Sequence, residues 1–260
     1  MLRVSAVAAM LAAIGRGWNH GGEIMKLAKP RIDIGFATNN APPVLAFWQD
    51  EIGLPFDHTQ PIRRGHRQHR HDLRGSVLKI NQMYETLPDN PPSGYRELLI
   101  AREGLSQAVA HVDPEGNRVA LVPPGRFGIQ RIGIRLGVRD VAAHARFYAE
   151  ALQLPEIAPA DLGADARAFL AGDTVLVVAP AADAPDDAAF DGKGWRYITF
   201  QVFAVDREHA HVLAHGGREG YAPVTLGTTA RISMVRDPDG NWIELSQRAS
   251  LTGSLEPVGA

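Results

Sequence analysis

The sequence predicts an α+β protein built from two tandem copies of one unit, and three observations support this prediction. The segment Phe47–Pro55 (FWQDEIGLP) returns as Phe147–Pro155 (FYAEALQLP). The segment Asp113–Leu121 (DPEGNRVAL) returns as Asp237–Leu245 (DPDGNWIEL), with an Asp-Gly type of turn that is common between strands. In both copies, a stretch of alternating apolar and polar residues, typical of a half-buried strand, precedes the first repeated segment.

Each copy is expected to begin with a strand followed by a helix. Apolar residues recur at every second position in Ile32–Ala37 and again in Ile132–Gly137. Asn40 and Asp140 follow these stretches and are expected to cap the helices, because their side-chain oxygens can accept hydrogen bonds from unpaired helical N–H groups.

More strands follow each helix, and the second copy then repeats the whole pattern. Strand-like runs cover Ser76–Met83 and Thr174–Ala179. In the second copy, alternation over Tyr197–Val202 precedes a helix over Val205–Ala214 and two strands around the turn Asp237–Gly240. The second copy therefore contains two βαβββ units. The first copy has too few residues for this, so we expect its second unit to lack the helix.

The amino-terminal segment offers two interpretations. An apolar run over Val4–Ile14 is too short to span a bilayer and resembles a signal peptide. The rival interpretation is that Met25 is the native start and the preceding residues are a translated leader. The predicted organisation is a leader or disordered amino terminus over 1–30, a first domain over 31–124, a second domain over 128–248 and a tail over 249–260.

Composition limits the partners and the chemistry. There are 27 Lys and Arg residues against 29 Asp and Glu, which gives a net charge of −2 and no field that would hold nucleic acid or an anionic membrane. The chain has no cysteine, so any metal ion must be bound by His, Asp, Glu or water. We expect a cytoplasmic protein that binds a small molecule, with a homodimer as an open possibility.

The strand, the helix with its aromatic pair and the closing DPDGNWIEL turn together resemble the vicinal oxygen chelate (VOC) superfamily. Its members include glyoxalase I, type I extradiol dioxygenases, methylmalonyl-CoA epimerase and the fosfomycin and bleomycin resistance proteins. The resemblance extends from about Arg31 to Gln247. It implies tandem βαβββ units that form two open, cup-shaped mixed sheets, with helices on the convex face and a ligand cavity on the concave face.

The alternation of residue types agrees with this implied shape. The residues expected under the helices are apolar: Ile32, Ile34, Phe36, Ile132, Ile134, Ile198, Phe200, Ile243 and Leu245. The residues expected to line cavities occupy the opposite face: Asp33, Gly35, Gly133, Arg135, Tyr197, Thr199, Gln201, Trp242 and Glu244.

In metal-dependent members of this superfamily, the ligands come from the first strand of each unit and from the closing strand. The corresponding slots here are occupied by Asp33, Gly133 and Tyr197 on first strands, and by Glu244 and Ala120 on closing strands. None is histidine. The second copy alone offers one carboxylate, which is too few for a metal that needs about three protein ligands.

A metal site remains open if units pair across the two copies. Asp33 and Glu244 would then face one cup, joined by His69 and His71, which point the same way if they lie on a strand. Such a set could chelate Fe²⁺, Mn²⁺ or Zn²⁺ and leave positions for two vicinal substrate oxygens. The alternative is that His66–His71 is a solvated, basic edge strand or loop.

Several further residues are candidates for substrate binding. Lys79 and Asn81 share one face of a predicted strand and could bind an anionic group. Arg135 should be paired, and its partner is either Glu244 or a substrate carboxylate. If the partner is the substrate, Glu244 is free to act as a base or a metal ligand.

Two aromatic residues complete the candidate site. Tyr197 could orient a substrate oxygen catalytically, or form a hydrogen bond within the core. Trp242, together with Tyr197, could stack on a planar ligand.

The resemblance gives one leading function and two rivals. The leading interpretation is a dioxygenase- or lyase-type enzyme, similar to glyoxalase and the extradiol dioxygenases, that acts on a small oxygenated substrate with aromatic or carboxylate groups. The first rival is a metal-free binding or resistance protein similar to the bleomycin resistance group. The second rival is a metal-free lyase or isomerase in which Glu244 is the base.

Overall fold

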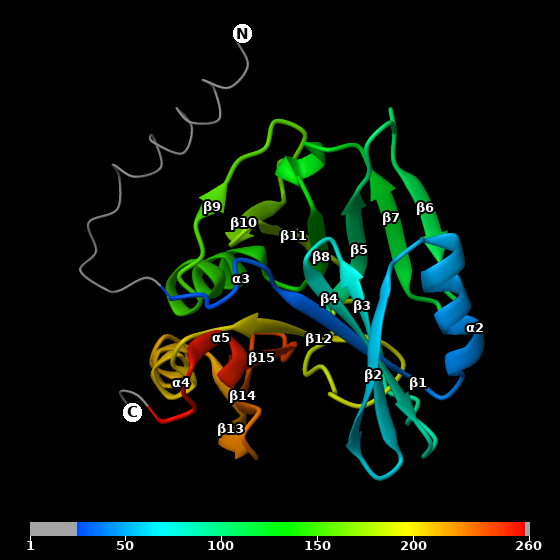
Figure 1. The fold of residues 1–260 in the computed structure, drawn as a ribbon. Coiled ribbons are helices and arrows are strands. Elements are labelled where there is room, and N and C mark those ends of the chain that lie inside the picture. The colour runs from blue at the N-terminus through cyan, green and yellow to red at the C-terminus, as the bar shows by residue number, and fades with distance from the viewer. Residues whose placement is uncertain (1–24, 258–260) are drawn as a thin grey trace, which may run out of the picture.

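The computed structural model describes residues 25–257, which form two mixed β-sheets with few helices (Figure 1). In spatial order, the eight-stranded sheet comprises β13 (Arg218–Leu226), β14 (Ala230–Arg236), β15 (Trp242–Arg248), β12 (Gly194–Gln201), β1 (Asp33–Thr38), β4 (Ser76–Met83), β3 (His66–Leu73) and β2 (Phe56–Arg63). The seven-stranded sheet comprises β6 (Val109–Val112), β7 (Arg118–Val122), β5 (Tyr95–Ala101), β8 (Ile132–Val138), β11 (Thr174–Pro180), β10 (Arg167–Ala171) and β9 (Glu156–Ile157). The predicted α+β class is confirmed.

Each sheet joins strands from both copies. The eight-stranded sheet combines the first unit, β1–β4, with the last unit, β12–β15. The seven-stranded sheet combines β5–β7 with β8–β11. Within each unit the first strand runs parallel to one later strand, as in β1 with β4 and β12 with β15, whereas the two units meet through antiparallel pairs, β1 with β12 and β5 with β8. The units therefore pair across the two copies, which is the arrangement that the sequence left open.

The repeated aromatic segments form matching helices. The helix α2 (Ala41–Ala46) continues into the π-helical turn η1 (Phe47–Glu51), and α3 (Val141–Arg146) continues into η3 (Phe147–Ala151). Trp48 and Tyr148 are fully buried in the main apolar core. The nine residues predicted to lie under the helices all belong to this core. Burial of an aromatic side chain removes a large apolar area from water, so these segments hold the helices onto the sheets.

The two predicted helix caps have different outcomes. Asp140 caps α3, because its side chain accepts a hydrogen bond of 3.0 Å from the N–H of Ala143. Asn40 occupies the predicted N-cap position of α2, but its side chain accepts no capping hydrogen bond. The hydroxyl of Thr38 instead accepts a hydrogen bond of 2.8 Å from the N–H of Asn40, and Pro42 near the start of α2 lacks an N–H to be capped.

The shortened unit of the first copy lacks its helix, as predicted. Residues 102–108 connect β5 to β6 without one, whereas the second copy forms α4 (Val205–Ala214) within the predicted bounds. Two shorter helical segments complete the described chain, η2 (Arg126–Gly128) and α5 (Ala249–Thr252). No helix in residues 25–257 has the length and apolar character needed to cross a membrane.

Residues 1–24 of the predicted leader lie outside the described part of the chain. Residues 25–30, which the predicted organisation includes in that leader, lie against the eight-stranded sheet. The side chain of Met25 is buried in the core, and the N–H of Ala28 donates a hydrogen bond of 2.8 Å to the carbonyl of Gln201.

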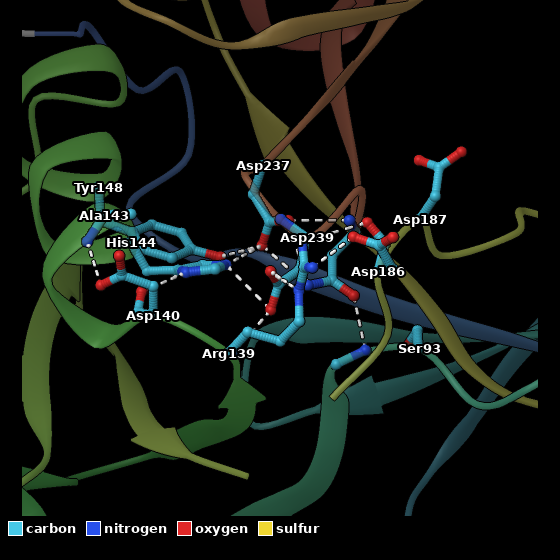
Figure 2. A network of polar contacts seen from close by, with 12 residues as sticks. Ser93, Arg139, Asp140, Ala143, His144, Tyr148, Asp186, Asp187, Asp237 and Asp239 are labelled. Atoms are coloured by element: carbon cyan, nitrogen blue, oxygen red, sulfur yellow. Dashed lines mark hydrogen bonds and ion pairs between the residues drawn. The ribbon is translucent and has the colours of Figure 1, made fainter. Parts of the chain in front are cut away.

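A buried polar network surrounds the closing turn between β14 and β15 (Figure 2). Asp237 accepts hydrogen bonds from the backbone of Asp239 and Asn241, which fixes the turn. The imidazole Nε2 of His144, on α3, lies 3.5 Å from Asp237 and 3.7 Å from Asp239. Tyr148 donates to the same Asp237 carboxylate at 3.3 Å. Through these contacts the turn of the eight-stranded sheet is held by the helix of the neighbouring unit.

Candidate functional site

Three polar side chains form one row across the middle of the eight-stranded sheet. Asp33 on β1 is paired in register with Thr199 on β12, and Thr199 is paired with Glu244 on β15. Ile34 and Ile198, which alternate with them, are buried in the core under the helices. Because alternate residues of a strand point to opposite faces, the row lies on the face away from the helices.

Lys79, on β4, extends across this face to reach the row. Its Nζ lies 2.6 Å from Thr199 Oγ1 and 2.9 Å from Glu244 Oε2. The hydroxyl of Thr199 in turn donates to Glu244 Oε2 at 2.8 Å. The other carboxylate oxygen, Oε1, has no hydrogen-bond partner among residues 25–257. The ammonium group therefore neutralises Glu244 through one oxygen and leaves the other oxygen free.

Gly35 leaves the space that brings these groups together. It lies between Lys79 on β4 and Tyr197 on β12 in the register of the sheet. A Cβ atom at this position would lie 2.5 Å from the ring of Tyr197, so the ring occupies the place of a side chain. The ammonium of Lys79 lies 5.3 Å from the centroid of that ring, a cation–π distance.

A chain of hydrogen bonds fixes the hydroxyl of Tyr197. Asn81 donates from Nδ2 to this hydroxyl at 3.1 Å and to the carbonyl of Phe36 at 3.0 Å. Its Oδ1 accepts from Gln68 at 3.0 Å and lies 2.9 Å from Nε2 of His66. The hydroxyl of Tyr197 thus accepts a bond and keeps its own proton available. Burial, and then the charge of Glu244, raise the pKa of Tyr197 well above its ordinary value, so the group remains a donor.

Lys79, Asn81, Tyr197 and Glu244 line a cavity of about 830 Å³ on the face of the eight-stranded sheet away from the helices. Its apolar wall includes Phe190, Tyr221 and Met234. Trp242 packs beside this wall, with its ring centroid 5.1 Å from that of Phe190 and 5.6 Å from that of Tyr221. The volume and the mixed lining are those of a site for a small organic molecule.

The predicted metal-ligand set is not brought together. Glu244 lies in the cavity, but His69 and His71 point to the other face of β3 from Gln68 and Arg70, which line the cavity. His69 is bonded to Thr59 and Gln82, and His71 contacts Gln49. Burial lowers the pKa of His71 to about 4, so it is neutral.

Asp33 faces the same side as Glu244, as the cross-copy arrangement requires, but its oxygens are already bonded. Oδ1 accepts from Lys29 and from the N–H of Val77, both at 2.8 Å, and Oδ2 accepts from Gln201 at 3.3 Å. Among residues 25–257, no group of three His, Cys, Asp or Glu side chains could hold a metal ion. These donors do not fit the three-ligand centre of the metal-dependent relatives. The alternative for His66–His71 also differs from the structure, since β3 lies between β2 and β4 and is not an edge strand.

The structure places Arg135 in the other sheet. Its Nε lies 3.8 Å from Glu97, and its guanidinium lies 5.3 Å from the ring of Phe127. Its partner is therefore neither Glu244 nor a group in the cavity of the eight-stranded sheet. The corresponding face of the seven-stranded sheet is filled by an apolar cluster, in which the side chain of Ile129 lies over Gly133.

Four of the predicted site residues do meet in one place. Lys79, Asn81, Tyr197 and Glu244 all line the cavity, and Trp242 packs against its wall.

Sequence reasoning missed Thr199 as a bonding partner, and it missed Gln68 and Arg70 altogether. Thr199 could have been found from the alternation of residue types, which already placed it on the face of the strand opposite to that of Phe200. For β3 the signal is weaker, because polar residues occupy both faces of the strand and the pattern cannot indicate which set points inward.

Comparisons with known proteins agree with this architecture. Residues 128–245 match the model of the Glyoxalase/Bleomycin resistance protein/Dioxygenase superfamily. Glyoxalase I from Zea mays has a similar structure, with a TM-score of 0.67 and 13% identity over 86% of this chain and 95% of that one. A putative dioxygenase from Bacillus subtilis gives a TM-score of 0.62 and 11% identity over 92% of this chain and 93% of that one. No curated protein sequence matches the chain.

The family match covers residues 128–245, so it confirms the resemblance to the glyoxalase, bleomycin resistance and dioxygenase (VOC) superfamily for this part of the chain. Over most of its length, the chain has the fold of the two structures above, as the TM-scores show.

Proposed function

We propose that this protein binds a small, planar, oxygenated molecule in the cavity of the eight-stranded sheet, and that it does so without a metal ion. The observation that carries the proposal is the bond between Lys79 and Glu244. The protein's own ammonium group occupies one oxygen of the only carboxylate that fills a family ligand slot on a closing strand. The positive charge that a divalent ion supplies in metal-dependent relatives is supplied here by a side chain.

The cavity offers contacts for both the oxygens and the plane of such a molecule. The hydroxyl of Tyr197 can donate a hydrogen bond, and Oε1 of Glu244 can accept one. Phe190 and Tyr221 provide aromatic surface in the lining of the same cavity. A flat ligand with oxygen substituents on one edge would satisfy both parts of the lining.

A second candidate function is proton transfer, and the free Oε1 of Glu244 favours it. A carbonyl compound bound with its oxygen toward Lys79 and Tyr197 would place an adjacent C–H near this carboxylate. The C–H bond breaks, Glu244 takes the proton, and the electron pair moves onto the carbonyl oxygen to give an enolate. The ammonium and the hydroxyl would stabilise the enolate oxygen.

The first experiment measures binding of the neutral planar probe 3-hydroxy-2-naphthamide by calorimetry, before and after dialysis against a chelator. We expect binding that survives dialysis. We also expect Tyr197→Phe to weaken it roughly 3- to 10-fold, which is the effect of one lost hydrogen bond. Arg135→Gln, in the other sheet, is the control and should change nothing. Loss of binding with loss of a stoichiometric metal would contradict the proposal.

The second experiment tests proton transfer with 2-tetralone in deuterated buffer. NMR measures exchange of its acidic C–H protons against the uncatalysed background rate. The wild-type protein should accelerate the exchange and Glu244→Gln should not. Exchange at the background rate with both proteins would leave binding as the function and reject catalysis on this class of ketone.

A further inference from the structure

We propose that Arg70 forms a carboxylate-binding subsite at one end of this cavity, so that the ligand is an aromatic acid with an oxygen substituent beside its carboxylate. This inference builds on the proposed function and specifies the class of molecule. Arg70 is not among the residues that the sequence indicated.

The guanidinium of Arg70 is buried without a negative partner. The side chain lines the cavity, and the residue is 8% exposed. Its one described contact is neutral, a hydrogen bond of 2.9 Å from Nη1 to Oε1 of Gln68. No carboxylate among residues 25–257 forms an ion pair with it. A buried charge that lacks a counter-ion is costly, and a bound anion would remove that cost.

Gln68 holds the guanidinium in a fixed orientation. Its Oε1 accepts from Arg70 and also from Gln60 at 3.1 Å, while its Nε2 donates to Asn81 at 3.0 Å. The amide is therefore bonded at both ends. Arg70 keeps its other N–H groups for a ligand, and a guanidinium fork matches the two oxygens of a carboxylate.

Two other arginines, the buried Arg196 and the half-buried Arg231, differ in this respect. Arg196 also lines the cavity, but it donates to the carbonyls of Pro91, Ala189 and Asn90. Arg231 forms a two-bond pair with the carboxylate of Asp206. Arg70 thus differs from both in having neither a set of carbonyls nor a carboxylate.

The cavity as a whole carries a positive charge, although the protein has a net charge of −2. Its lining contains Lys79 and the four arginines Arg63, Arg70, Arg196 and Arg248, against the two carboxylates of Asp191 and Glu244. Such a field attracts an anion and raises its local concentration.

The position of Arg70 determines which part of the ligand it would bind. It is paired directly with Lys79 across β3 and β4, and its charge acts on Tyr197. A carboxylate on Arg70 would therefore place a neighbouring hydroxyl or carbonyl oxygen near Lys79 and Tyr197. This arrangement matches an aromatic acid with its oxygen substituent at the adjacent ring position.

The test compares two probes of similar shape by calorimetry on the full chain, the anionic 3-hydroxy-2-naphthoate and the neutral 3-hydroxy-2-naphthamide. The wild-type protein should bind the carboxylate at least 10-fold more tightly than the amide. Arg70→Gln should weaken carboxylate binding roughly 10- to 100-fold and change amide binding less than about 2-fold. Arg70→Lys keeps the charge without the fork and should fall between the two.

Arg67→Gln is the matched control, because Arg67 lies on the same strand but points away from the cavity. It should bind both probes as the wild type does. Equal binding of the two probes by the wild type, or an Arg70→Gln variant that loses both probes alike, would overturn the subsite and leave the proposed function standing. A wild-type protein that binds neither probe would overturn the proposed function as well.

Discussion

The indole Nε1 of Trp48 donates a hydrogen bond of 3.1 Å to the carboxylate of Asp113, which begins the closing turn of the next unit. The second copy repeats the contact with a different chemical group. The hydroxyl of Tyr148 donates to Asp237 at 3.3 Å. In both copies, therefore, an equivalent contact joins the repeated aromatic segment to the repeated closing turn. They explain why the aromatic pair and the closing turn occur together in each copy.

The first prediction concerns the contribution of this contact to stability. Trp48→Phe removes the donor and leaves Asp113 buried with one partner fewer, so we expect a loss of about 1–3 kcal/mol in the free energy of unfolding. Urea unfolding of Trp48→Phe, Asp113→Asn and the double variant measures the coupling between the two residues. Strictly additive effects would show that the hydrogen bond contributes nothing.

The repeats account for how much of the fold could be predicted. Periodicity placed β4 and α4 within their observed bounds, since each has one apolar face and clear ends. The pairing of units across the copies could be stated only as an alternative. Register and strand order depend on contacts between segments far apart in the chain, such as Asp33 with Thr199, and the local pattern does not contain them.

The candidate site was predictable to a lesser degree, and β3 shows why. The inward set of this strand includes Gln68 and Arg70, and the outward set includes His69 and His71. Both sets are polar, so choosing the histidines because they bind metals selected the wrong face. Lys79 and Asn81 were easier to place, because the apolar residues Leu78 and Ile80 alternate with them.

Gly35→Ala is predicted to disturb both stability and binding. The new Cβ would lie 2.5 Å from the ring of Tyr197, which must then move. We expect a loss of about 1–3 kcal/mol in the free energy of unfolding, together with weaker binding of 3-hydroxy-2-naphthamide. Gly163→Ala is the control, because a Cβ atom at that position would have no neighbouring atom within 4 Å. Unchanged stability and binding in Gly35→Ala would mean that the tyrosine ring is not held over the glycine.

Lys79→Met is predicted to destabilise the protein through the carboxylate it leaves behind. The side chains of Lys79 and Glu244 are 5% and 16% exposed, so the carboxylate would lose its counter-ion in a largely buried place. We expect a loss of about 3 kcal/mol at neutral pH, and recovery of most of it in Lys79→Met/Glu244→Gln. Thermal and urea unfolding measure both. A double variant as unstable as the single one would indicate that packing of the lysine chain, and not its charge, stabilises the site.

His144 is predicted to give the protein a pH-dependent stability. Burial lowers the pKa of this imidazole, but the hydrogen bond and charge of Asp237, with the charge of Asp239, outweigh burial and raise its pKa above 6.5. Protonated His144 therefore stabilises the fold below about pH 6.5, and this stabilisation is lost as the pH rises through the raised pKa. Its size is about 1.4 kcal/mol for each unit by which the pKa in the folded state exceeds the pKa in the unfolded state.

Urea unfolding between about pH 6 and pH 8 tests this prediction. The stability of the wild-type protein should fall across the range relative to that of His144→Gln. His58→Gln, at a half-exposed histidine, should follow the wild type. Parallel curves for the wild type and His144→Gln would show that the network in Figure 2 does not hold a proton on His144.

The last prediction tests whether Lys79 excludes a metal ion from this site. Thr199→His would place an imidazole beside Glu244, with Asp33 in the same row of the sheet, but the ammonium of Lys79 would still occupy Glu244. Combining it with Lys79→Ala frees that oxygen, so that the imidazole and Glu244 can be joined by Oδ2 of Asp33, which within residues 25–257 is held only by the 3.3 Å bond from Gln201. A set of His, Glu and Asp suits Zn²⁺. We expect Zn²⁺ to raise the melting temperature of the double variant, with a stabilisation of about 3 kcal/mol at a hundred times the dissociation constant. Thr199→His alone should not respond. If that single variant responds as strongly, the ammonium does not keep metals out, and metal-independent binding at this cavity loses its principal support.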